Sequence, residues 1–180
     1  MKRLLAVTVA LLAVASGCGP ANTPPAAIDS FFPKDNEVGA WVEDTSIGKA
    51  GVEVTTTAKE TTDLVDGSAE PFITEGMVGF GWQSYVNGTY KLDLRVWRFK
   101  SAAASQTAFD WLFLNASLYK AATWTELAVG DAGKIADTGG SWWVSARKGA
   151  YIIEAKVVPK DATSRADVET IATTVAGKIH

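Results

Sequence analysis

Four carboxylate side chains within 13 residues are the first candidates for chemistry: Asp63, Asp66, Glu70 and Glu75. Asp63, Asp66 and Glu70 are spaced by three and four residues, so a continuous helix would place them on one face. Such a cluster could bind Ca²⁺. Alternatively, any two carboxylates among these four and Asp93 could act as the general acid and base of a glycosidase. A solvated helix face is the more frequent arrangement. The sequence therefore assigns no residue to catalysis or to a metal.

The rest of the inventory excludes most catalytic constellations. The chain has one histidine, His180, and one cysteine, Cys18. His180 is the terminal residue of the sequence, and Cys18 is expected to carry a lipid, as argued below, so a Ser-His-Asp triad, a Cys-His pair and a histidine-ligated zinc site are not expected. The glycines of residues 76–81 lack the Lys-Ser/Thr ending of a phosphate-binding loop and lead into an expected strand. We expect no cofactor, and a non-enzymatic role is favoured.

Cys18 has a different chemistry, because it follows what reads as an export signal. Lys2 and Arg3 precede an apolar run of 12 residues, which is too short to span a bilayer, and small residues then lead to the cysteine. This pattern is similar to the lipobox of bacterial lipoproteins, in which the cysteine thiol takes a diacylglycerol group. The sequence predicts a signal peptide over residues 1–17, cleavage before Cys18 and anchoring by acyl chains.

One globular domain is expected after the anchor. Residues 18–27 are rich in proline and small residues, which is typical of a flexible tether. Residues 28–180 suit a single domain, because 47% hydrophobic residues and 7 tryptophans supply enough apolar area for a core. Removal of Lys2 and Arg3 changes the formal charge from −3 to −5, and this negative charge argues against binding to nucleic acid. The expected partners are the membrane, through the lipid, and an envelope protein or small ligand.

Two similar units are expected to build this domain. Each has the order strand, tight turn, strand, helix, as judged from strand alternation and helical apolar stripes. The expected elements span residues 82–86, 90–96 and 101–117 in the first unit, and 143–147, 151–158 and 164–179 in the second. Further strands are expected near residues 39–42, 51–57, 77–82 and 123–129.

An offset of 61 residues superposes the units, about 82–117 and 143–179, with five identities. The same offset pairs Asp93 with Glu154 and Arg95 with Lys156. Two ββα repeats would join their strands into one antiparallel sheet and bury the apolar stripes of both helices on one face. The predicted fold class is therefore α+β in two layers.

Trp142 and Trp143 are candidates for stacking against a sugar ring or another small ligand. Adjacent residues of a strand point to opposite faces, so the two rings cannot form one platform. Packing in the core is the alternative for either ring.

The segment LVDGSAEPF at residues 64–72, followed by EGM at 75–77, carries a family resemblance, together with the strand at 90–99 and the helix start at 103–109. These features resemble the uncharacterised bacterial family catalogued as domain of unknown function 6599, over roughly residues 41–179. The resemblance implies an exported, often lipid-anchored domain and no specific activity. Because it centres on this segment, Asp63, Asp66, Gly67 and Glu70 are the first candidates for a binding site.

A lipid-anchored binding module of the bacterial cell envelope is the function that these features favour. A glycan hydrolase with paired carboxylates and a cation-binding protein with oxygen ligands are the alternatives. Gly19, rather than aspartate, follows Cys18. In a two-membrane bacterium this predicts the outer membrane, with the domain in the periplasm.

Overall fold

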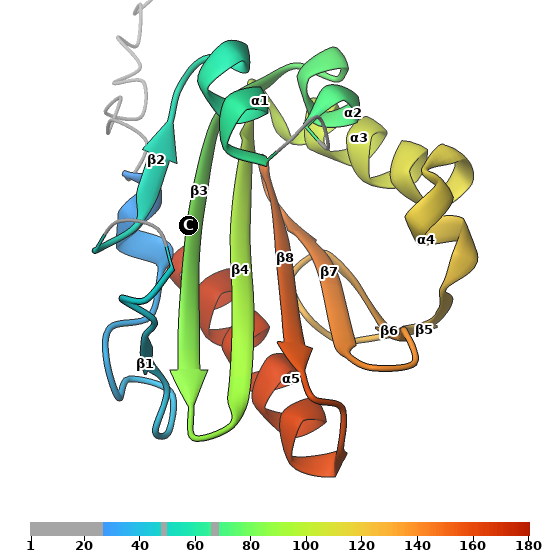
Figure 1. Cartoon of the computed structure of the whole chain (residues 1–180). Coiled ribbons are helices and arrows are strands. Elements are labelled where there is room, and N and C mark those ends of the chain that lie inside the picture. The colour runs from blue at the N-terminus through green and yellow to red at the C-terminus, as the bar shows by residue number, and fades with distance from the viewer. Residues whose placement is uncertain (1–26, 48–49, 66–68) are drawn as a thin grey trace, which may run out of the picture.

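The computed structural model describes residues 27–47, 50–65 and 69–180. Within these residues an antiparallel sheet of eight strands runs in the order β1-β3-β4-β8-β7-β6-β5, and β2 pairs with β3 on the same side as β1 (Figure 1). The strands are β1 (Val42–Glu43), β2 (Glu53–Thr55), β3 (Met77–Asn87), β4 (Tyr90–Phe99), β5 (Thr123–Glu126), β6 (Ala132–Asp137), β7 (Trp142–Lys148) and β8 (Tyr151–Val158). The predicted α+β class and antiparallel sheet are confirmed.

The two predicted hairpins form the centre of the sheet. Asn87 pairs with Tyr90 across the β3–β4 turn, and Lys148 pairs with Tyr151 across the β7–β8 turn. Gly88 begins the first turn with a φ of +60°, a conformation that glycine adopts without the strain of a Cβ atom. The strands predicted at 77–82 and 82–86 are one continuous strand, β3, and β6 was not predicted.

The helices are the 3-10 helix η1 (Ile28–Phe31) and the α-helices α1 (Ala58–Val65), α2 (Glu70–Thr74), α3 (Ala102–Asn115), α4 (Ser117–Ala121) and α5 (Ala162–Lys178). Side-chain caps begin the two long helices. Ser101 Oγ accepts a hydrogen bond from the Ala104 amide at 3.1 Å, and Asp161 forms a capping box with Ser164. None of the helices in the described part of the chain is long and apolar enough to cross a membrane.

Each face of the sheet carries a buried core. On one face, Leu94 and Val96 of β4 pack with Val168 and Ile171 of α5 in a first core. On the opposite face, aromatic residues of β3 and β4 pack with apolar residues of α2, α3 and α4 in a second core; these residues are Phe80, Trp97, Phe99, Phe72, Phe109, Leu112 and Tyr119. In Figure 1, α5 lies behind the sheet, whereas α1 to α4 gather toward its upper end and right side.

The prediction that both long helices cover one face of a two-layer fold is therefore wrong. The chain folds in three layers, with α3 and α5 on opposite faces of the sheet. Consecutive apolar residues in β8, including Ile152 and Ile153, are fully buried on both faces, and such a strand requires a cover on each side.

The ββα order of the two predicted units is present, but an internal repeat of the structure is not confirmed. β4 and β8 pair antiparallel at the centre of the sheet, with Val96 opposite Ile153. A rotation that exchanges these strands within the sheet would leave α3 and α5 on the same face. Because they lie on opposite faces, the similarity stops at the hairpins.

Candidate functional site

The acidic segment predicted from the sequence does not form one helix face. Asp63 is exposed on α1, where its Oδ2 atom lies 2.5 Å from Lys59 Nζ. α1 ends at Val65, and Glu70 is the first residue of a second helix, α2. Asp63 and Glu70 therefore lie on two different helices and do not share one helix face. Asp66 and Gly67 lie outside the described residues, as does Cys18.

The alternative of a cation site gains no support from the residues that the structure describes. Glu75 follows α2 as its C-terminal cap and is half-buried. In the described part of the chain, no three His, Cys, Asp or Glu side chains come together in an arrangement that could hold a metal ion.

Trp142 and Trp143 point to opposite faces of β7, as predicted. The Trp142 indole donates a hydrogen bond to the Asp161 carbonyl oxygen at 2.8 Å, and the Arg165 guanidinium carbon lies 4.9 Å from its ring centroid. The Trp143 ring packs against Tyr119, at 4.6 Å between centroids, on the other face. Other protein groups already contact the Trp142 ring, whereas the Trp143 ring lines an open groove.

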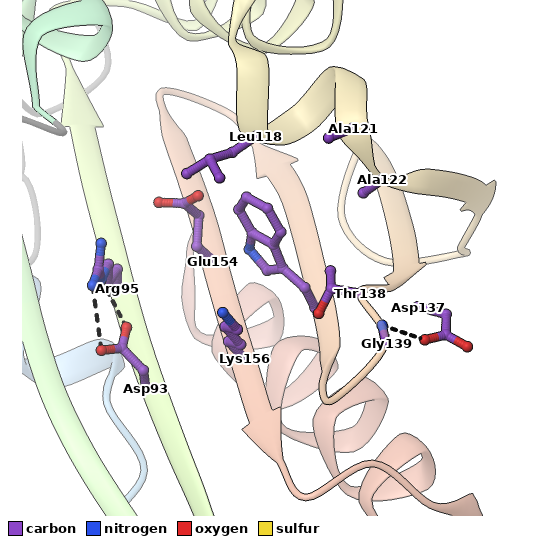
Figure 2. Close-up of a pocket in the computed structure, with 11 residues that line it drawn as sticks. Asp93, Arg95, Leu118, Ala121, Ala122, Asp137, Thr138, Gly139, Glu154 and Lys156 are labelled. Atoms are coloured by element: carbon purple, nitrogen blue, oxygen red, sulfur yellow. Dashed lines mark hydrogen bonds and ion pairs between the residues drawn. The ribbon is translucent and has the colours of Figure 1, made fainter.

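The groove lies on the sheet face opposite α5, beyond the part that α3 covers, and has a volume of about 780 Å³. Figure 2 shows its floor on β4 and β8 and its walls on α4, β7 and the β6–β7 turn. Its lining residues are Asp93, Arg95, Leu118, Ala121, Ala122, Asp137, Thr138, Gly139, Trp143, Glu154 and Lys156. This volume is in the range of sites that bury small organic ligands.

Four charged side chains form the floor of the groove. Asp93 and Arg95 lie two positions apart on β4 and therefore on the same face of the sheet. The sheet register places Lys156 opposite Asp93 and Glu154 opposite Arg95. Arg95 donates to Asp93 through Nε at 2.7 Å and through Nη2 at 3.4 Å. The Trp82 indole donates to the same carboxylate at 3.0 Å. Asp93 is thus held on both oxygens.

Glu154 is the most deeply buried charged group of the floor, with 8% of its surface exposed. The Trp97 indole donates to its Oε2 atom at 2.6 Å, and the Tyr119 hydroxyl donates to its Oε1 atom. Burial raises the pKa of the Glu154 carboxyl above its ordinary value, although Arg95 and the two donors act in the opposite direction. The site therefore contains a carboxyl group that keeps its proton more readily than a solvated glutamate.

Lys156 differs from its neighbours because it has no polar partner within the part of the chain that the structure describes. Its side chain is exposed, and no hydrogen bond or ion pair joins it to the described residues. By contrast, Asp137 at the rim of the groove accepts from Lys160 Nζ at 2.6 Å and from the Gly139 amide at 2.8 Å. The walls are apolar at Leu118, Ala121 and Trp143, and Leu118 is 71% exposed.

The sequence contained part of the signal for this site. Asp93 is a carboxylate candidate in the sequence, and the offset that pairs it with Glu154 also pairs Arg95 with Lys156. All four line the groove. Glu154 was missed as a site residue because it stands within an apolar stretch of β8.

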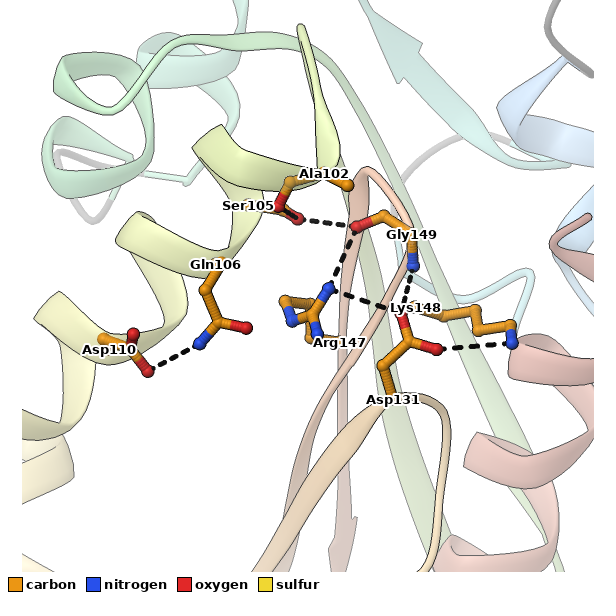
Figure 3. A network of polar contacts seen from close by, with 8 residues as sticks. All are labelled: Ala102, Ser105, Gln106, Asp110, Asp131, Arg147, Lys148 and Gly149. Atoms are coloured by element: carbon orange, nitrogen blue, oxygen red, sulfur yellow. Dashed lines mark hydrogen bonds and ion pairs between the residues drawn. The ribbon is translucent and has the colours of Figure 1, made fainter.

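A second polar network, at the β7–β8 turn, is structural (Figure 3). The Asp131 carboxylate accepts from the Gly149 amide at 2.8 Å and pairs with Arg147 and Lys148, each at 3.3 Å. The hydrogen bond from Gly149 and the two cations hold the pKa of Asp131 below its ordinary value. Ser105 of α3 donates to the Gly149 carbonyl oxygen at 2.7 Å, which fixes the turn against the helix.

Fold and site together define an α+β domain with a ligand-sized groove on a partly covered sheet face. No protein-family model matches the chain, and no curated protein sequence matches it. The extracellular domain of PknH from Mycobacterium tuberculosis aligns over 86% of this chain and 97% of its own, with 14% identity and a TM-score of 0.46. An uncharacterised protein from Mycobacterium smegmatis aligns over 87% and 98%, with 11% identity and a TM-score of 0.38. TM-scores below 0.5 do not establish a shared fold, and the similarity to the domain of unknown function 6599 family stays a prediction.

Proposed function

We propose that this protein is a lipid-anchored binding module of the bacterial cell envelope, and that its domain binds a small ligand in the groove over β4 and β8. The sequence around Cys18 supports the anchor. The groove supports binding, because it combines a charged floor with apolar walls, as ligand sites usually do. The groove is the single observation that carries the proposal.

The anchor is tested by the Cys18→Ser variant expressed in the native host. Acylation of Cys18 predicts that the wild-type protein sediments with membranes and that mass spectrometry finds acyl chains on its N-terminal peptide. The variant lacks the thiol and should be found in the fraction without membranes. Wild-type protein that is not acylated would contradict the anchor and leave the groove to be judged separately.

The groove is tested by native mass spectrometry of protein isolated from the host envelope. Ala121→Trp places an indole in the groove, and we expect this variant to lose a small molecule that the wild-type protein retains. Ala166→Trp, on the exposed side of α5, is the matched control and should retain it. The same bound mass in Ala121→Trp as in the control would contradict a site in this groove.

A hydrolase acting on glycans is the second candidate, because Asp93 and Glu154 line one groove and burial raises the pKa of Glu154. A proton-holding carboxyl near a second carboxylate is the arrangement that glycosidases use. Neither Asp63, Glu70 nor Glu75 lines this groove. Incubation with envelope glycans would release new reducing ends with the wild-type protein and none with Glu154→Gln if the domain is a hydrolase.

A further inference from the structure

We infer that the groove binds a small organic carboxylate, with its anionic group at Lys156 and an aromatic or aliphatic body against Trp143 and Leu118. This inference rests on the proposed function, since it names the class of ligand for the same groove. It follows from which polar groups of the groove the protein leaves without a partner.

The carboxylates of the groove already have donors. Asp93 accepts hydrogen bonds from Arg95 and Trp82, and Glu154 accepts hydrogen bonds from Trp97 and Tyr119. Asp137 accepts hydrogen bonds from Lys160 and from the Gly139 amide. A cationic ligand would have to compete with these contacts. The groove therefore offers little unused capacity to accept hydrogen bonds.

Lys156, by contrast, has unused capacity to donate hydrogen bonds. Among the charged side chains that line the groove, it alone has no ion pair or hydrogen bond within the described chain. Its ammonium has three donors, and it stands on β8 directly opposite Asp93, whose charge Arg95 already balances. An anion that enters the groove would gain a charge-assisted hydrogen bond from Lys156 without breaking a contact within the protein.

The walls specify the rest of the ligand. Trp143 presents an indole that is only partly buried, and Leu118 of α4 is 71% exposed beside it. An apolar body placed against these side chains would remove their surface from water, which favours binding. Inorganic anions lack such a body and would leave these walls exposed.

Two probes with the same apolar body and opposite charge test this inference, 4-phenylbutyrate and 4-phenylbutylamine. Binding to the mature full-length protein is measured by titration of the indole N–H signals in ¹⁵N-labelled samples. We expect phenylbutyrate to shift the Trp143 signal and leave Trp142, on the opposite sheet face, unchanged. Phenylbutylamine should bind more weakly.

The Lys156→Gln variant removes the ammonium and should weaken phenylbutyrate binding by about tenfold or more, the usual worth of a charge-assisted hydrogen bond. Lys120→Gln is the matched control, because Lys120 is exposed on α4 and does not line the groove. Its affinity should equal that of the wild type.

Three results would overturn the inference. Tighter binding of the amine would show that the groove prefers ligands of the opposite charge. Equal phenylbutyrate affinity in Lys156→Gln and wild type would show that Lys156 does not hold the anionic group, and in both cases the proposed function would stand. Absence of any Trp143 shift with phenylbutyrate up to saturation of its solubility would also reject the ligand class. In that case the native mass spectrometry of Ala121→Trp decides separately whether the groove is a site.

Discussion

At the scale of single residues, Glu154 places an ionisable side chain at a buried position of the sheet. It is one carboxyl in a stretch of β8 whose neighbours are fully buried. Burial of an ionised carboxylate is costly unless hydrogen bonds compensate, and Trp97 and Tyr119 supply them. A buried carboxyl whose pKa is shifted in this way is typical of functional sites.

The Glu154→Gln variant should change how stability depends on pH. Because the folded state raises the pKa of Glu154 above its ordinary value of 4.5, the folded protein binds this proton more tightly than the unfolded chain. The stabilising contribution is fully present below pH 4.5 and is lost as pH rises through the folded pKa. Urea unfolding between pH 4 and 8 should therefore show the wild type losing stability relative to the variant as pH rises. Parallel pH profiles would contradict a raised pKa at this residue.

At the scale of elements, β6 shows why one strand was missed. Gly133 interrupts its apolar pattern, and glycine in a strand usually signals a turn or a bulge. The structure shows that a Cβ atom at this position would lie 2.7 Å from the Leu127 carbonyl oxygen and 2.8 Å from that of Val129. The glycine is therefore explained by close approach of the β5–β6 loop, which no local pattern reveals.

The loop between β5 and β6 should also be sensitive at Gly130. Its φ is +67°, and a Cβ atom there would lie 2.3 Å from the Arg147 carbonyl oxygen, so Gly130→Ala must displace backbone. Gly139→Ala is the matched control, because its φ is +85° but nothing lies within 4 Å. The control should lose about 1 kcal/mol of unfolding free energy from backbone strain alone, and Gly130→Ala clearly more. Equal losses in chemical denaturation would contradict the close approach.

At the scale of the whole molecule, the sheet separates two cores. α5 covers one face completely enough to bury Val168 and Val175, whereas α3 covers part of the other and leaves the charged floor open. The charges on β4 and β8 are therefore tolerated because they stand where helix coverage ends. This division of one sheet face into a core and a groove is the feature on which the proposed function depends.

Because each face of the sheet has a buried core, large-to-small substitutions on either face should lower the free energy of unfolding. Ile171→Ala in α5 and Leu112→Ala in α3 each remove a buried side chain, with 1% and 2% exposure, and should each lower the unfolding free energy by about 2–5 kcal/mol. Leu114→Ala, at a position 71% exposed on α3, is the control and should stay within about 0.5 kcal/mol. A small effect of Leu112→Ala would contradict a packed second face.

Patterns that extend over a few residues were enough to predict much of the local structure. The alternation of side chains located both central hairpins, Ser101 marked the start of α3, and adjacent positions in β7 required Trp142 and Trp143 to point apart. These features follow from the backbone period of strands and helices, which acts over a few residues.

Which face each helix covers, and which residues share the groove, depend on contacts between elements far apart in the chain. The lining residues come from β4, α4, the β6–β7 turn, β7 and β8, which are brought together by burial of apolar surface between elements far apart in the chain. The sequence drew attention to the acidic segment around Asp63 and Glu70, because neighbouring carboxylates are visible in a linear chain. Glu154 and Lys156 acquire their roles only when α3 stops short of them and leaves one part of the sheet open.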